Sequence, residues 1–368
     1  MPKPLRRLYQ KWHRLGEVVG LCHRAESRWH LSLPITASRA WHLCKTERFE
    51  PIEAFRLGLF GRDRGHEPSR YVSRKRLTKA QEALNPAGWA CLLKNKDLFY
   101  RHCTALGVPI PQLYAVLQSP APGWSYTHRP IRTREDWEAF SKNDLPTEIA
   151  VKPAIGAYGR GFNLFSRADG KYVDARQTCL EAGALYDAFA SPDGNRYIIQ
   201  ERLHNHGDLV RLSATEALQT VRMITLVDSR GDAHLLHAHL KIIEADEIVD
   251  TFIDGLTGNI EAPVDLVSGR LKVANRISGT GAGVLAVATH PKTNVPFAGA
   301  ALPFWSEACA LVQRTARLFL PVRTVGWDVA LTPDGPVIVE GNVWWDPPNQ
   351  HGTMPALLRQ LEGQDSPR

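Results

Sequence analysis

Apolar residues recur at two different spacings along this chain, and the change of spacing predicts where helices give way to strands. In the first 90 residues or so the spacing is helical, as at Leu5, Leu8 and Trp12. From Pro109 onward, short apolar runs bounded by Gly, Pro and Asp predict strands. Helical segments interrupt these runs without a regular strand–helix–strand repeat. This mixture predicts an α+β fold.

The pattern after residue 90 predicts a definite series of elements. Helices are expected over 95–106, 134–140, 178–189 and 305–319. Strands are expected over 109–117, 148–153, 161–165, 197–203, 221–226 and 234–243, the last two as an antiparallel pair. Asn95 and Thr133 are the expected caps of the first two helices.

The last two predicted strands, within residues 325–342, form a hairpin around Pro-Asp-Gly at 333–335. Pro sets φ at the start of a type I turn, and Gly takes the left-handed position that closes a three-residue loop. In that register Val329 faces Val339. The register also decides which polar residues meet across the hairpin.

Asp328 falls directly opposite Glu340, and cross-strand partners have Cβ atoms roughly 5 Å apart. Asn342 returns to the same face because strand side chains alternate. Two carboxylates and an amide oxygen suit one or two Mg²⁺ ions held partly by phosphate oxygens, and Mn²⁺ could replace them. The alternative is a solvated face of an amphipathic hairpin. Because the flanking run 337–339 is apolar, unpaired acids would be costly there, and we favour the metal site.

A lysine and three glycines precede this hairpin in the chain. Lys152 ends one predicted strand, and Gly156, Gly159 and Gly161 follow before the next strand. Glycine backbone N–H groups can approach phosphate oxygens closely, and lysine adds a point charge. In a Walker loop the lysine follows the glycines and a helix begins there, so this is a flap between two strands. A purely structural turn is the better interpretation of the flap alone, and its position ahead of the metal hairpin reverses that preference.

Other polar residues fit a nucleotide site. The strand 197–203 ends in polar groups, as needed to bind the edge of adenine, and Asp208 beyond it could bond ribose hydroxyls. Arg222 and Lys241 lie on consecutive strands as donors for a triphosphate or a developing acyl phosphate. Taken singly, a core strand and two surface cations explain them equally well.

Composition sets the class of protein. The chain has 368 residues, 43% hydrophobic and 23% charged, as expected for a globular protein of two or three domains. No apolar run approaches the ~20 residues of a membrane-spanning helix, and Glu17 interrupts the nearest candidate for a secretory signal. The six cysteines are dispersed and include no C-x-x-C, which favours reduced thiols. We expect a cytoplasmic protein.

Positive charge is concentrated at the N-terminus. Residues 1–80 carry 18 Lys and Arg against seven Asp and Glu, whereas the rest carries 27 against 31. Such a segment could attract nucleic acid, anionic lipid or an anionic carrier substrate, or could be a solvated helical surface. Of these partners we disfavour nucleic acid and keep peripheral membrane contact open. The sequence does not define the oligomeric state.

In their order along the chain, these parts resemble the ATP-grasp superfamily, and in particular the sugar-transfer-associated ATP-grasp family. The similarity runs from Asn95 to about Gly352. It lies in NKDLFYRHCTALGVPIP, VKPAIGAYGRGF, IIQERL, TVRMITLVD, HPKTNVPFAGAALPFW, VGWDVA and GPVIVEGN. The last two segments are the most specific.

The resemblance implies ATP held between two α+β subdomains, with Lys96 and Lys152 on the phosphates and the glycine flap closing over them. At the adenine it places Gln200, Glu201 and Leu203, and at the ribose Asp208. We accordingly expect a basic helical region over 1–90, a lid subdomain with the flap over 91–205, and a core subdomain with the metal hairpin over 206–368.

The resemblance also implies an Mg-ATP-dependent carboxylate–amine or carboxylate–thiol ligase. ATP would phosphorylate a small-molecule carboxylate, and an amine-type acceptor would displace phosphate; a glycan precursor is the acceptor that the family name suggests. Many such ligases carry an arginine two residues before the first metal-binding acid, where this chain has Gly326, and Arg222 or Lys241 would replace it. Two alternatives stay open: a phosphotransferase acting on a sugar or small metabolite, and a non-catalytic nucleotide-binding module with a basic attachment region.

Overall fold

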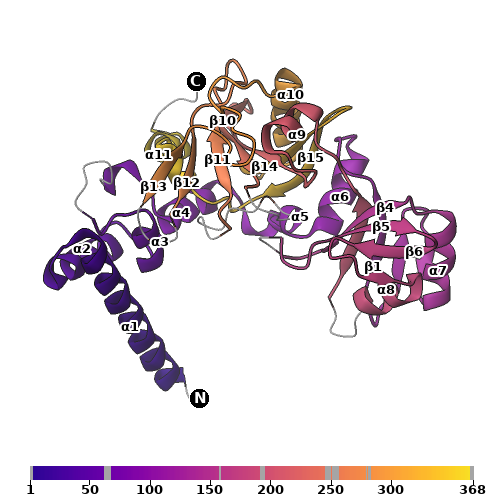
Figure 1. Ribbon diagram of the computed structural model, residues 1–368, viewed down its shortest axis with the longest axis horizontal. Helices are drawn as coiled ribbons and strands as arrows, with labels where there is room; N and C mark the ends of the chain where they lie inside the picture. Colours follow the sequence, from indigo (N-terminus) through magenta and orange to yellow (C-terminus); the bar gives the residue numbers. More distant parts are fainter. Residues whose placement is uncertain are drawn as a thin grey trace.

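The computed structural model describes residues 3–61, 68–156, 159–190, 195–244, 250, 257–278, 280 and 283–364, with the side chains of 3–15 and 68 left out. Its helices and strands combine two antiparallel sheets with flanking helices, so the predicted α+β class is confirmed (Figure 1). None of the described helices contains an apolar stretch of the length that a membrane crossing requires.

The N-terminal region is helical, as predicted. It contains α1 (Lys3–Trp29), α2 (Leu33–Lys45), α3 (Pro51–Arg56) and α4 (Arg74–Leu84). A short turn, η2 (Pro68–Arg70), precedes α4, and two short helical segments, η3 (Ala87–Trp89) and α5 (Cys91–Lys94), follow it. Figure 1 shows α1 extending away from the rest of the molecule toward the N-terminus. The helices α1–α3 enclose a small core around Phe49, Phe55 and Phe60, which also includes Ile277 of the core sheet described below.

The first sheet has eight strands in the order β3-β2-β1-β8-β4-β5-β6-β7, and every neighbouring pair is antiparallel. We call it the lid sheet. Its strands are β1 (Leu113–Leu117), β2 (Gly123–Ser125), β3 (Pro130–Ile131), β4 (Glu148–Pro153), β5 (Asn163–Ala168), β6 (Lys171–Asp174), β7 (Cys179–Leu180) and β8 (Tyr197–Glu201). Helices α7 (Arg134–Asn143) and α8 (Ala182–Phe189) pack on this sheet, whereas the buried hydrophobic residues of α6 (Lys96–Ala105) belong to the hydrophobic cluster of the core sheet described below.

Local chemistry explains where these elements begin. The Asn95 side chain accepts hydrogen bonds from two backbone N–H groups of α6, and Thr133 forms a capping box with Asp136 at the start of α7, so both predicted caps are confirmed. β1 begins at Leu113, four residues later than predicted, because the prolines at 109 and 111 have no N–H for the ladder. The helix predicted from residue 178 begins at 182, because 179–180 pair with β6.

The second sheet has seven strands in the order β13-β12-β11-β10-β9-β14-β15, again all antiparallel. We call it the core sheet. Its strands are β9 (Thr220–Val227), β10 (Ala233–Ile242), β11 (Ile260–Pro263), β12 (Ala274–Ile277), β13 (Val284–Val287), β14 (Thr324–Thr332) and β15 (Gly335–Asn342). The antiparallel pairing predicted for the segments at 221–226 and 234–243 is that of β9 with β10.

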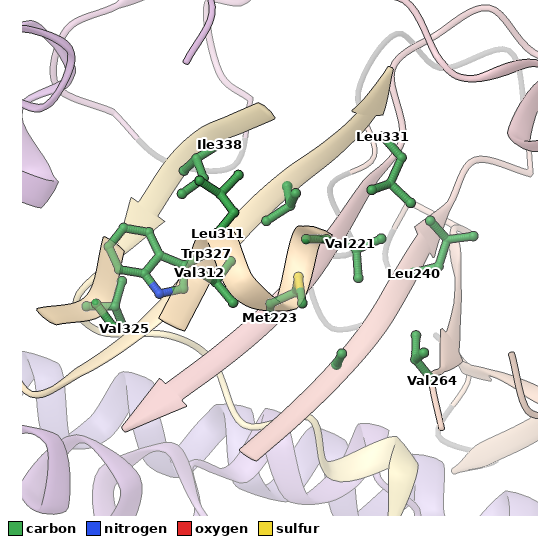
Figure 2. Packing of buried hydrophobic residues seen from close by; sticks show 14 of the residues in the cluster. Val221, Met223, Leu240, Val264, Leu311, Val312, Val325, Trp327, Leu331 and Ile338 are labelled. Carbon is green, nitrogen blue, oxygen red and sulfur yellow. The ribbon is translucent and has the colours of Figure 1, made fainter. Parts of the chain in front are cut away.

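The two faces of the core sheet have different partners. Helix α10 (Trp305–Leu318) packs on one face, and Figure 2 shows its Leu311 and Val312 among Val221, Met223 and Trp327. The opposite face is partly covered by α4 and by the C-terminal helix α11 (Met354–Leu361), which bury Ile224 and Leu226. The uncovered remainder of this second face carries the polar residues described below. Two short helical segments, α9 (Gly207–Ser213) and η5 (Asn349–His351), complete the fold.

The hairpin β14–β15 corrects one prediction. Thr332 pairs with Gly335 and Val329 with Ile338, so the loop has two residues rather than three. A bulge at Val339 then restores the predicted pairing of Asp328 with Glu340. The predicted loop length was wrong, and the predicted pairing of Asp328 with Glu340 is confirmed. Both hold because the bulge adds the one residue that the shorter loop removes.

Buried asparagines attach the N-terminal helices to the core sheet. Asn85, which ends α4, donates to the carbonyls of Thr324 and Val343 and accepts from the N–H groups of Arg323 and Thr324. Asn349 exchanges two hydrogen bonds with the backbone of Val72. Residues before 90 are therefore an integral part of the packing around the core sheet.

Candidate functional site

A cavity of about 620 Å³ lies where the uncovered face of the core sheet, the glycine flap and the N-terminal helices meet. Among the predicted site residues, those that line it are Lys96, Lys152, Gly156, Gly159, Arg222, Lys241, Asp328, Glu340 and Asn342. The N-terminal helices contribute Glu53 and Arg56 from α3 and Arg74 from α4.

One row of paired residues crosses four strands of the core sheet beneath this cavity. Glu340 pairs with Asp328, Asp328 with Arg222, and Arg222 with His239. Directly paired residues of antiparallel strands point to the same face of a sheet. The topology β15-β14-β9-β10 therefore places an acid, a second acid, a guanidinium and an imidazole side by side.

Asp328 is the most heavily contacted residue of this row. Arg222 donates from Nε to Oδ1 at 2.6 Å and from Nη2 to Oδ2 at 3.1 Å. Lys241 Nζ lies 3.2 Å from Oδ2, and Asn342 donates to the same oxygen at 3.4 Å. Burial by itself would raise the pKa of Asp328, but the charges and hydrogen bonds of Arg222 and Lys241 together hold that pKa well below its ordinary value. The carboxylate is ionised at any physiological pH.

Lys241 bridges Asp328 to a third acid. Its ammonium lies 3.2 Å from Asp250 Oδ1, and Thr220 donates to Asp250 Oδ2 from both its N–H and its hydroxyl. Burial lowers the pKa of Lys241, yet the attraction of Asp250 and Asp328 raises it more. Lys241 therefore stays charged. Their ion pairs with Asp328 and Asp250 thus fix the charged groups of Arg222 and Lys241 at the base of the cavity.

Lys152 has a different environment. It is buried at the end of β4, where its ammonium donates to the Tyr100 hydroxyl at 3.1 Å. Burial is the main cause that lowers the pKa of Lys152 to about 7, with the Lys96 charge acting in the same direction and Glu340 opposing it. An anionic ligand in the cavity would restore the proton. Such a lysine is poised to respond to the binding of phosphate.

Lys96 and the flap close the site beside Glu340. The Lys96 ammonium lies 3.6 Å from Glu340 Oε2 and donates to the carbonyl of Gly156 at 3.0 Å. Gly161 has φ +74°, and a Cβ there would lie 2.9 Å from the Pro153 ring, so the flap requires glycine at this position. Ala157 and Tyr158 lie outside the described residues.

The oxygen atoms of the metal hairpin fit Mg²⁺, which takes hard oxygen ligands and shares them with phosphates. Among the described residues, three donors contact Oδ2 of Asp328, whereas Arg222 Nε alone contacts Oδ1, which has a second lone pair. Glu340 is one-third exposed, and Lys96 is its one ion-pair partner within the described part of the chain. Asn342 directs its amino group at Asp328 and Gly326, which leaves its carbonyl oxygen for a cation. This donor set suits Mg²⁺ completed by phosphate oxygens.

Gly326 is packed closely by two neighbours. A Cβ at this position would lie 2.8 Å from Trp345 Cβ and 3.2 Å from Arg222 Cδ. The Arg222 side chain thus runs directly over Gly326 on its way to Asp328. The absence of a side chain at Gly326 makes room for this path of Arg222, and the replacement of the expected arginine by Arg222 or Lys241 stays a prediction.

The other predicted nucleotide contacts lie away from the lining of this cavity. Gln200 is buried with its Oε1 2.7 Å from the Tyr100 hydroxyl, and Glu201 accepts from the Gln112 N–H. Asp208, at the start of α9, contacts Arg211 and His206. Gly161 and Leu203 are also absent from the lining. The assignments of Gln200, Glu201 and Leu203 to adenine and of Asp208 to ribose stay predictions.

The sequence interpretation missed a cluster at the edge of the cavity, two members of which, His239 and Glu261, belong to the lining. It consists of His237 and His239 of β10, Glu261 of β11 and His351 of η5, and we call it the imidazole cluster. Burial lowers the pKa of His351 to about 4 and that of His237 well below its ordinary value, so both rings are neutral at pH 7. The signal in the sequence was His-x-His at strand spacing, which places two imidazoles on one face. Glu261 and His351 had no comparable signal.

We compared the chain with known protein families and with curated proteins. The family profile described as sugar-transfer associated ATP-grasp matches residues 75–357, which is more than three quarters of the chain. A comparison with curated proteins finds no match.

Solved structures give distant likenesses. Biotin carboxylase from Campylobacter jejuni is 11% identical with a TM-score of 0.42, over 76% of this chain and 48% of that one. D-alanyl-alanine synthetase A from Vibrio cholerae is 12% identical with a TM-score of 0.40, over 74% and 65%. A RimK domain ATP-grasp protein from Sphaerobacter thermophilus is 14% identical with a TM-score of 0.37, over 79% and 76%. The chain spans less than two thirds of the first two proteins, and no functional assignment follows from likenesses of this size.

Proposed function

The chain belongs to the sugar-transfer-associated ATP-grasp family, and on that premise we propose that it is an Mg-ATP-dependent ligase that joins a carboxylate to an amine or thiol. The observation that carries the proposal is the convergence of cations and oxygen ligands at one cavity. Lys96, Lys152, Arg222 and Lys241 line it together with Asp328, Glu340 and Asn342. The whole lining carries eight Lys and Arg against six Asp and Glu, and a polyphosphate would balance the excess of positive charge.

The phosphate end of the site is formed by Lys96, Lys152 and the flap. Both ammonium groups lie next to the flap or its preceding strand, and Lys96 is near Glu340. The β- and γ-phosphates of ATP would accept from these lysines and from flap N–H groups. Glu340, Asn342 and Asp328 would hold Mg²⁺, which supplies neutralisation of phosphate charge when bound.

Arg222 and Lys241 are suited to the transfer step. In the proposed reaction, a carboxylate oxygen of the substrate attacks the γ-phosphorus, the bond to the β-phosphate oxygen breaks, and ADP leaves. The amine then attacks the acyl carbon, the bond to phosphate breaks, and inorganic phosphate and a proton leave. Negative charge develops on the reacting oxygen atoms in both steps, and fixed hydrogen-bond donors beside those atoms lower the activation barrier. The contacts of Arg222 with Asp328, and of Lys241 with Asp328 and Asp250, hold the two donors in position.

The acceptor end of the cavity is the least defined. Glu53, Arg56 and Arg74 of the N-terminal helices form part of the lining, so a charged acceptor would meet both signs of charge there. The family description is the basis for proposing an acceptor from glycan biosynthesis, and we assign the reaction to the cytoplasm, where ATP is available. Peripheral membrane contact by the basic helices stays a prediction.

A screen for ADP release tests this function. Amino acids and hydroxy acids are offered with ATP and Mg²⁺, each with and without amine-bearing or thiol-bearing acceptors. We expect full turnover only when carboxylate and acceptor are both present, with one ADP and one phosphate for each new bond. A stable phosphate ester formed without a second substrate would instead identify a phosphotransferase. ADP release in neither format would favour a non-catalytic nucleotide-binding module.

A further inference from the structure

The imidazole cluster begins at His239, the last member of the row that contains Arg222, and its residues are different from the oxygen ligands of the metal hairpin. His239 pairs with Arg222 across β9 and β10, and Glu261 pairs with Lys241 across β10 and β11. His351 reaches the same place from η5. We propose that this cluster is a second metal site, which binds one divalent transition-metal ion of the zinc type.

The spacing of the donor atoms supports the proposal. His239 Nε2 lies 3.5 Å from Glu261 Oε1, and His351 Nε2 lies 3.4 Å from Glu261 Oε2. One nitrogen from each of the three histidines falls within 4.8 Å of the others. Ligand atoms at about 2.0–2.1 Å from a tetrahedral Zn²⁺ are separated from each other by roughly 3.3–3.4 Å. The observed spacing needs only small movements to close around an ion.

The His351 ring offers two buried nitrogen atoms as possible metal ligands. Its side chain is fully shielded from solvent, and neither Nδ1 nor Nε2 makes a hydrogen bond of acceptable geometry with any described residue. The contact of Nε2 with Glu261 is close enough for an ion pair but poorly aligned. Buried polar atoms without a partner are costly. A metal ion would satisfy the nitrogen that faces the cluster.

Glu261 supplies a buried negative charge at the same point. It is 4% exposed, and the partners that its carboxylate contacts in the described part of the chain are His239, His351 and the Gln350 amide, with no Lys or Arg among them. An ionised carboxylate is costly to bury unless a cation is close. Gln350 holds one carboxylate oxygen in place, as the partners of metal ligands commonly do.

The second contact of His239 is also typical of a metal ligand. Its Nδ1 lies 3.1 Å from Nε2 of His237, and the Nδ1 of His237 lies 3.4 Å from the Thr353 hydroxyl. A hydrogen bond to the far nitrogen fixes the tautomer and orientation of a ligating ring. Imidazole nitrogens favour Zn²⁺ and its transition-metal neighbours over Mg²⁺, whereas the oxygen ligands of the hairpin favour Mg²⁺. The two sites therefore select different ions.

Metal binding by the full-length protein tests the proposal without any nucleotide. Chelator-treated wild-type protein is titrated with Zn²⁺ by calorimetry and with Co²⁺ by visible absorption. We expect one Zn²⁺ per chain, a ligand-field spectrum of tetrahedral intensity with Co²⁺, and binding that tenfold excess Mg²⁺ does not displace. His351→Gln and His239→Gln should each weaken Zn²⁺ binding at least tenfold.

Two control variants make the result decisive. His234→Gln removes a histidine of the same strand that is paired with Asp228 outside the cluster, and it should bind Zn²⁺ like the wild type. Asp328→Asn alters the metal hairpin and should also keep Zn²⁺ binding. The proposal is overturned if wild type gives no Co²⁺ spectrum, if His351→Gln binds Zn²⁺ as tightly as wild type does, or if Asp328→Asn abolishes the binding. The Co²⁺ spectrum of wild type decides the matter even if the glutamine variants do not fold.

Discussion

Asp328 and Arg222, 106 residues apart in the sequence, lie directly opposite each other on β14 and β9, and the guanidinium donates to both oxygens of the carboxylate. Both side chains are largely shielded from solvent. The pair fixes a cation on the face of the sheet where the hairpin also presents Glu340 and Asn342. Most of the expected behaviour of the site follows from this arrangement.

Arg222→Lys should reduce ligase turnover on the order of 100-fold, because lysine keeps the charge but not the planar two-point contact. Steady-state ADP release measures this. A matched control is Arg230→Lys, an exposed arginine paired with Asp228 at a β-turn, which should leave turnover unchanged. Equal turnover of Arg222→Lys and wild type would remove Arg222 from the transfer step.

Glu340→Gln should abolish most Mg²⁺-dependent turnover and raise the Mg²⁺ concentration needed for half-maximal rate at least tenfold, because one carboxylate ligand is lost. EDTA should stop wild-type turnover, and added Mg²⁺ or Mn²⁺ should restore it. Asp334→Asn changes an exposed acid in the turn of the same hairpin and serves as the control. An unaltered Mg²⁺ requirement in Glu340→Gln would contradict the metal assignment.

Nucleotide binding should take up protons through Lys152. Its pKa of about 7 in the free protein means that about half of the molecules lack this proton at pH 7. A bound phosphate favours the charged form and raises the pKa, so affinity for ADP should fall by up to about tenfold per pH unit above pH 7. Calorimetry in buffers of different ionisation enthalpy measures the uptake directly.

Lys152→Met is the matched variant for that experiment, because it keeps an unbranched side chain only one atom shorter and removes the titrating group. It should bind ADP more weakly and lose the proton uptake between pH 7 and 8. Uptake that persists in Lys152→Met would come from another group, and the role given to Lys152 would then be wrong.

Gly326→Ala should destabilise the fold by about 1–3 kcal/mol and also lower turnover, since the new methyl group would press on Trp345 and displace Arg222. Urea unfolding and ADP release measure the two effects. In Gly88→Ala nothing lies within 4 Å of the added carbon, so neither quantity should change appreciably. Normal stability and activity in Gly326→Ala would show that Arg222 does not depend on this close approach.

Asn85→Ala should lower the free energy of unfolding by about 3 kcal/mol, because it leaves buried backbone groups of Arg323, Thr324 and Val343 without partners. Asn143→Ala, at the exposed end of α7, should change it by roughly 0.5 kcal/mol or less. If both variants unfold at the same urea concentration, Asn85 does not secure α4 to the core sheet.

The sequence predicted the features that depend on residues close together in the chain, such as hairpin strands and helix caps. Alternation and turn residues located β14 and β15, and the opposition of Asp328 and Glu340 followed even though the loop was one residue shorter than expected. Caps at Asn95 and Thr133 were readable because a cap and its helix are contiguous.

Contacts between distant segments were not predictable in this way. The pairing of β9 with β14, which brings Arg222 to Asp328, is a choice of strand order that no local pattern encodes. The imidazole cluster is assembled from β10, β11 and η5, and its members have no sequence spacing that would link Glu261 to His351. Gly326 looked like a missing arginine, and only the packing of Trp345 and Arg222 over it explains why glycine stands there.

The β-bulge at Val339 has an effect beyond the hairpin. With the same residues, a regular ladder would set Val339 against Asp328 and turn Glu340 toward α10. The carbonyl of Val339 instead lies 3.1 Å from the Tyr100 hydroxyl, and that hydroxyl accepts from Lys152, also at 3.1 Å. Through Tyr100, this one additional peptide unit connects the strand that bears Glu340 to the lysine on the lid sheet. The same bulged residue therefore turns the acid toward the cavity and links its strand to the buried lysine.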